Sequence, residues 1–178
     1  LFIGRIDYQK GPDLMAEAIP KVLGSRWDAK FIFVGDGGMR SYIEHRVNEL
    51  GVGHATRFLG WTPFWAHLEL LNACDIVCIP SRNEPFGIVL LEAWATGRPV
   101  VATDVGGLGE NIENFVDGVK VYTYPDSIAW GINYLLNSPD EMRRISANAG
   151  EKVKKFNWTD ALAKLINTYK SVMQEHAK

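Results

Sequence analysis

Short apolar runs alternate with helix-length amphipathic segments along most of the chain. The runs are rich in Val, Ile and Phe, and several lack polar alternation, which is typical of strands covered on both faces. This alternation predicts a Rossmann-like α/β fold, a parallel sheet with helices on both faces. Strands are expected at residues 1–6, 30–34, 56–59, 75–80, 99–103 and 118–122. Helices are expected between them, at residues 12–23, 39–50, 64–72, 87–96 and 127–137.

After residue 122 the pattern predicts helices only. Typical helix starts, a capping residue followed by Pro or an acidic first turn, occur at Ser138 and Asn157. We predict one domain over residues 1–178, with a body at about residues 1–155 and a terminal helix over residues 157–178. Because the chain opens inside a predicted strand, without Met, we interpret it as part of a longer protein whose missing part lies upstream. The terminal helix carries an apolar stripe at helical spacing: Trp158, Leu162, Leu165, Ile166, Tyr169 and Met173.

Composition narrows the classes of partner. The net charge of −2 gives no global basic field to collect nucleic acid or an anionic membrane. No apolar run approaches the ~20 residues that a membrane helix needs. The cysteines, Cys74 and Cys78, lack a zinc-site spacing and are predicted as buried thiols on one face of a strand. No metal site is expected, and the free thiols favour a reducing, cytoplasmic setting.

Candidate chemistry gathers in the loops that follow the strands, where open parallel sheets bind their ligands. The loop after the first strand carries Arg5 and Lys10, and the loop after the fourth carries Glu84. Glycine-rich loops at residues 35–38 and 104–109 let backbone N–H groups approach a phosphate or a sugar. Together these loops indicate a phosphorylated, hydroxyl-rich ligand.

Taken one at a time, these features have ordinary structural explanations. Arg5 and Lys10 resemble solvated surface charges, and residues 35–38 resemble a plain turn. Glu84 precedes Pro85, which holds it extended, whereas Glu92 lies within a predicted helix and is also explained as a paired helical carboxylate. The histidines are predicted as surface or packing residues away from the site: His45, His54, His67 and His176.

Residues 80–93 resemble the signature of the group 1 (family 4) retaining glycosyltransferases, enzymes of the two-domain GT-B fold. Glycogen and starch synthases are more distant members of this group. Glu84 and Glu92, separated by seven residues, reproduce the paired glutamates of that signature. Other landmarks follow in the family's order at residues 4–5, 10–11, 33–37, 58–61, 73–75 and 99–107.

The resemblance implies a role for each matching residue. Arg5 and Lys10 would neutralise the donor's diphosphate in place of a divalent metal, and Glu84 would bind the donor sugar's hydroxyls; these three are the candidate catalytic residues. Glu92 would accept hydrogen bonds from the ribose hydroxyls. The remaining candidates for binding the donor are Gly4, Gly35, Phe58, Gly60, Phe86, Gly87, Ile88, Val89, Gly106 and Gly107.

The resemblance further implies the C-terminal, donor-binding half of an enzyme that uses a UDP-, ADP- or GDP-hexose. Such an enzyme transfers the sugar with retention to a sugar or other hydroxyl acceptor and needs no cofactor. Its acceptor site lies in the missing N-terminal domain, so this chain alone is expected to bind the donor weakly without transferring sugar. Any membrane association would come through that missing half. Two alternatives stay open: an NAD-dependent oxidoreductase domain, disfavoured because the spaced glycine fingerprint is absent, and a non-catalytic nucleotide-sugar binding module.

Overall fold

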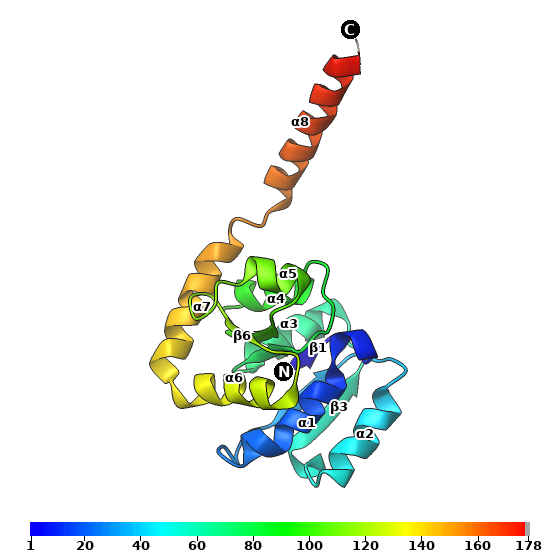
Figure 1. Cartoon of the computed structure of the whole chain (residues 1–178), viewed down its shortest axis with the longest axis vertical. Coiled ribbons are helices and arrows are strands. Elements are labelled where there is room, and N and C mark those ends of the chain that lie inside the picture. The colour runs from blue at the N-terminus through cyan, green and yellow to red at the C-terminus, as the bar shows by residue number, and fades with distance from the viewer. Residues whose placement is uncertain (177–178) are drawn as a thin grey trace.

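The computed structural model describes residues 1–176, and side chains through residue 174, as strands and helices that alternate along the chain (Figure 1). The strands are β1 (Phe2–Ile3), β2 (Phe31–Val34), β3 (Thr56–Gly60), β4 (Val77–Ile79), β5 (Val100–Thr103) and β6 (Val119–Val121). The helices are α1 (Pro12–Leu23), α2 (Arg40–Glu49), α3 (Phe64–Ala73), α4 (Ile88–Ala95), α5 (Gly106–Asn111), α6 (Pro125–Asn137), α7 (Pro139–Val153) and α8 (Trp158–His176). The predicted α/β fold is confirmed.

The strands form two parallel three-stranded groups, β1-β2-β3 and β4-β5-β6. Two backbone hydrogen bonds of 2.8 Å join the groups, from the Leu1 amino group to the Ile76 carbonyl and from the Cys78 N–H to the Leu1 carbonyl. The strand order is therefore 3-2-1-4-5-6, and it reverses between β1 and β4. Ligands of open α/β sheets bind beyond the carboxyl ends of the strands at this reversal.

Alternate residues of the central strands face two separate apolar cores. In β4, Val77 and Ile79 pack in the core that contains Trp94 of α4, whereas Cys78 packs in the core that contains Ile19 of α1. Successive strand residues point to opposite faces, so a strand covered on both faces needs apolar residues throughout. This explains why the predicted strands lacked polar alternation.

The prediction for the two cysteines was wrong in one respect. Helix α3 continues to Ala73, so Cys74 follows a helix and only Cys78 lies on a strand. Cys78 is buried, and burial raises the pKa of its thiol to about 12. That thiol therefore stays protonated at neutral pH.

Two differences from the expected elements concern the loops of the first and fifth strands. β1 ends at Ile3, although the backbone hydrogen bonding continues: the Gly4 N–H donates to Val34 at the end of β2, and the Ile6 N–H donates to Asp36 just beyond it. Residues 106–111 form the short helix α5. A loop was expected there, because three of these residues are glycine and one is asparagine, and neither favours a helix. Backbone contacts from the neighbouring loop, described below, hold this turn in place.

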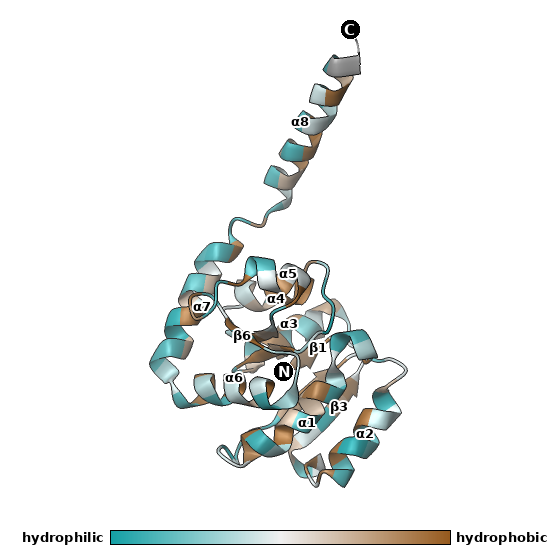
Figure 2. Cartoon of the chain, viewed as in Figure 1, coloured by the Kyte–Doolittle hydropathy of each residue, from teal (hydrophilic) through white to brown (hydrophobic). Residues whose placement is uncertain are grey.

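Helix α8 projects away from the body, and apolar residues recur along it among polar ones (Figures 1 and 2). The predicted stripe is exposed; Trp158, for example, is 82% exposed and Met173 71%. Within residues 1–176, no helix combines the length and the apolar character that crossing a membrane requires.

Gly150 in α7 offers a test of how a glycine inside a helix affects stability. A Cβ added there meets no atom within 4 Å, and the residue lies in a helix without a positive φ. Gly150→Ala is expected to raise the free energy of unfolding by about 0.5–1 kcal/mol, because alanine loses less backbone entropy on folding. Urea unfolding monitored by circular dichroism measures this change, and a lowered midpoint would contradict it.

Candidate functional site

The loops that follow β1 and β4 meet at the reversal of strand order through an ion pair. Lys10 Nζ lies 2.6 Å from Glu84 Oε2, and the Ser81 hydroxyl donates to the same oxygen at 3.2 Å. Glu84 is only 9% exposed. A buried carboxylate of this kind needs a cation and donors to offset its lost hydration. Two of the predicted catalytic residues thus come together, and Ser81 joins them.

Arg82 fixes these two loops against helix α1. Its guanidinium donates to both carboxylate oxygens of Asp13, at 2.8 and 2.6 Å, and lies 4.0 Å from the centre of the Tyr8 ring. The backbone N–H of Arg82 also donates to the Gln9 carbonyl at 2.7 Å. A two-pronged Arg–carboxylate contact sets orientation as well as distance. Arg82 was missed as a site residue because its partner lies far away in the sequence, although it stands within the signature.

The loop after β5 closes onto the backbone of Glu84. The Gly107 N–H donates to the Glu84 carbonyl at 2.8 Å, and a Cβ added at Gly107 would lie 2.5 Å from the Phe86 Cα. Gly106 has a φ of +45°, and its added Cβ would lie 2.3 Å from the Glu84 carbonyl oxygen. Only glycine allows this approach, so Gly106 and Gly107 contact the loop of Glu84, whereas their predicted role in binding the donor stays a prediction.

Helix α4 begins directly beside this loop, after Gly87 in the left-handed conformation with a φ of +92°. The N–H groups of Ile88 and Val89 belong to the first turn and have no carbonyl partner inside the helix. No side chain caps this end. A helix start with open N–H groups favours a phosphate, and Phe86, Gly87, Ile88 and Val89 together form the segment that leads into it.

Glu92, one turn further along α4, faces His67 of α3. The His67 Nε2 and Glu92 Oε2 atoms lie 3.2 Å apart, and the two side chains are 17% and 23% exposed. The expectation that every histidine lies away from the site was therefore wrong for His67. His45 pairs with Glu49 on the surface. His54 Nδ1 lies 3.1 Å from the Gly51 carbonyl oxygen at an exposed turn. The side chain of His176 lies outside the described residues.

The glycines at the ends of β1, β2 and β3 lie side by side. The Gly35 N–H donates to the Gly60 carbonyl at 2.8 Å, and a Cβ added at Gly35 would lie 1.9 Å from the Gly4 carbonyl oxygen. The Phe58 ring stacks on Phe33 of the core, with centroids 4.8 Å apart. The side chain of Phe58 therefore serves packing.

Arg5 takes a different position from Lys10. Its side chain is 69% exposed, lies 3.3 Å from Asp7 Oδ2, and donates to Gln9 Oε1 at 3.4 Å. Within the described side chains no ion pair joins it to Glu84. The structure thus places one predicted cation on the glutamate and the other at the surface of the same loop.

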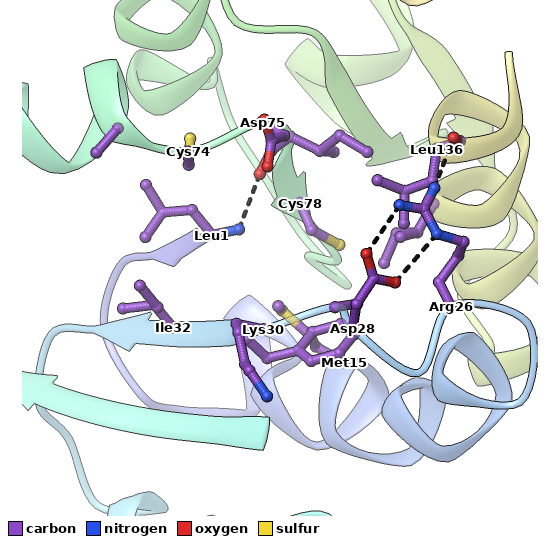
Figure 3. Close-up of a pocket in the computed structure, with 15 residues that line it drawn as sticks. Leu1, Met15, Arg26, Asp28, Lys30, Ile32, Cys74, Asp75, Cys78 and Leu136 are labelled. Atoms are coloured by element: carbon purple, nitrogen blue, oxygen red, sulfur yellow. Dashed lines mark hydrogen bonds and ion pairs between the residues drawn. The ribbon is translucent and has the colours of Figure 1, made fainter. Parts of the chain in front are cut away.

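Two cavities lie away from Lys10 and Glu84. One, of about 280 Å³, opens at the amino ends of β2 and β4, beside the Arg26–Asp28 ion pair (Figure 3). The other, of about 510 Å³, lies beyond β6 and contains the Lys120–Asp104 ion pair; its aromatic residues are Phe115, Tyr122, Tyr124 and Trp130. The candidate site is instead an open edge, built from loops at the carboxyl ends of the strands.

Comparison with known proteins identifies relatives of the chain by sequence and by fold. A family model described as "Glycosyl transferases group 1" matches residues 1–152. An uncharacterized glycosyltransferase from Methanocaldococcus jannaschii, MJ1607, is 43% identical over 176 residues, which cover 98% of this chain and 45% of that protein. The chain thus spans about half the length of the curated relatives it matches.

Solved structures share the fold. Anabaena Alr3699/HepE, solved with UDP, matches 96% of this chain and 48% of its own with a TM-score of 0.86 and 27% identity. It has also been solved with UDP-glucose. The C-terminal domain of the group 1 family protein LpcC from Francisella tularensis matches 86% of this chain and 83% of its own, with a TM-score of 0.79 and 25% identity.

Proposed function

The chain belongs to the group 1 glycosyl transferases, and we propose that it is the donor-binding half of a two-domain enzyme of this family. The observation that carries the proposal is the Lys10–Glu84 pair at the reversal of strand order. Similarity to a separately solved C-terminal domain of the family supports assigning the chain to that half.

The donor is a nucleoside diphosphate hexose, bound along the carboxyl ends of β1, β4 and β5. Glu84 accepts hydrogen bonds from hydroxyls of the sugar, and the first turn of α4 receives a phosphate. Lys10 and Arg5 face the diphosphate, whose negative charge grows as the bond to the sugar breaks. Cations already in place stabilise that growing charge without reorganisation. UDP in the Anabaena structure makes UDP the first nucleotide to test.

Transfer requires the other half of the enzyme. We infer that the acceptor binds to an N-terminal domain upstream, and that transfer proceeds with retention and without a metal. The cations of the first loop support the metal-independent route, because they supply the positive charge that a metal would otherwise bring. The isolated chain is expected to bind donor without measurable sugar transfer, which an assay with UDP-glucose and a mixture of acceptor sugars tests directly.

Calorimetry with UDP, ADP, GDP and NAD tests the donor site. One of the nucleoside diphosphates is expected to bind at least tenfold more tightly than NAD, and Glu92→Ala and Arg5→Ala are each expected to weaken that binding. Arg143→Ala is a matched control, because Arg143 is exposed on α7 and pairs only with Asp140 among the described side chains. Unchanged binding by both site variants would remove the site assignment, and tighter binding of NAD would favour an oxidoreductase.

A further inference from the structure

The contact between His67 and Glu92 contains two buried polar atoms that lack a hydrogen bond within the described residues. His67 Nε2 and Glu92 Oε2 are both inaccessible to solvent and lie 3.2 Å apart, yet within the described residues neither has a well-directed hydrogen-bond partner. A buried carboxylate oxygen without a donor is costly. Among the described residues, the His67 imidazole lies 3.2 Å from this oxygen, close enough for its N–H to supply that donor after a small rotation.

The two helices hold this pair in place. The backbone N–H of His67 donates to the Pro63 carbonyl at the start of α3, and the centroids of the Phe64 and His67 rings lie 6.4 Å apart. Glu92 lies one turn beyond the open start of α4, and its carbonyl accepts from Thr96. Both side chains therefore extend from regular helices, which fix the backbone positions of the pair.

We propose that His67 is a positioning residue that sets the orientation of the Glu92 carboxylate for the ribose of the donor. This inference rests on the proposed function. The imidazole N–H donates to Oε2, in either the neutral Nε2–H tautomer or the imidazolium. The other carboxylate oxygen, Oε1, is left to accept hydrogen bonds from the ribose hydroxyls. One carboxylate oxygen, rather than both, then faces the diol. His67 makes no contact with the ligand in this arrangement and acts through Glu92.

The alternative is that His67 only fills space between α3 and α4. A packing residue would affect all ligands of the folded chain alike, whereas a positioning residue affects only ligands that carry ribose hydroxyls. Leucine removes the donor and keeps much of the volume, and glutamine keeps a donor. These two substitutions therefore separate the roles.

The experiment compares calorimetric binding of UDP and 2′,3′-dideoxy-UDP by the wild-type chain, His67→Leu, His67→Gln and Glu92→Ala. The wild type is expected to prefer UDP by about tenfold, the order of a single well-made charged hydrogen bond. His67→Leu is expected to lose most of that preference with unchanged affinity for the dideoxy ligand, and His67→Gln to retain a larger part of it. Glu69→Ala, an exposed position on α3, serves as the control and keeps the full preference.

Each other outcome has a distinct meaning. If His67→Leu weakens both ligands equally, or neither, the positioning role is overturned. If Glu92→Ala abolishes the preference and His67→Leu does not, this inference fails while the proposed function stands. If the wild type binds neither ligand, the proposed function itself fails for UDP. Thermal unfolding checks that each variant is folded, and His67→Gln decides the question should His67→Leu unfold.

Discussion

Replacing Lys10 with alanine is expected to lower the turnover of the complete two-domain enzyme by about 10²-fold, the loss typical of removing one group that stabilises transition-state charge. The same substitution in this chain should weaken binding of a nucleoside diphosphate sugar, measured by calorimetry. It also takes the cation from Glu84, a nearly buried carboxylate that would keep, among the described side chains, only the Ser81 hydroxyl as a donor. That loss is expected to cost about 1–3 kcal/mol of folding free energy.

Two companion variants separate binding from folding. Glu84→Gln in the Lys10→Ala background removes the unpaired charge, so it should restore stability without restoring affinity. Lys164→Ala, at an exposed position on α8, should change neither quantity. A Lys10→Ala protein with wild-type affinity and turnover would show that Lys10 serves only the ion pair.

Replacing Gly106 with alanine is expected to disrupt the closing loop. The new Cβ would lie 2.3 Å from the Glu84 carbonyl oxygen, on a residue whose φ is +45°. Backbone atoms on both sides leave no flexible side chain to move aside, so the loop that carries Glu84 must shift. A cost of about 2–4 kcal/mol in the free energy of unfolding is expected, together with weaker donor binding.

Gly150→Ala is the matched comparison for this change, since it adds the same methyl group in open space and is expected to act in the opposite direction. Urea unfolding of the two variants side by side gives both signs in one experiment. A Gly106→Ala chain within about 0.5 kcal/mol of the wild type, the range of an ordinary surface substitution, would contradict the tight approach between the loops.

The sheet and its functional edge were predictable because both depend on local patterns. The unbroken apolar run around Val77–Ile79 predicts a strand covered on both faces, and the loop with Glu84 must then start at its carboxyl end. The order of strands was not predictable in this way. It depends on hydrogen bonds between Leu1 and residues 76 and 78, which no local pattern encodes.

The contacts between side chains were likewise predictable only in part. Lys10 and Glu84 could be placed at one edge from the sequence, but their direct contact depends on how two loops pack. The Arg82–Asp13 and His67–Glu92 pairs join separate elements, and the second depends on the rotation of α3 against α4. Periodicity indicates which face of a helix is apolar; it does not indicate which polar residue of a neighbouring helix will lie opposite.

The Lys10–Glu84 pair means that the proposed donor site already contains its own counter-ion. Arrival of a diphosphate would therefore exchange one anion for another at the lysine ammonium, rather than neutralise a bare charge. The exchange frees the Glu84 carboxylate just as hydroxyl groups of the sugar reach it. A nucleotide without its sugar would release the carboxylate and offer it nothing in return, so the pair favours the complete donor over the spent nucleotide.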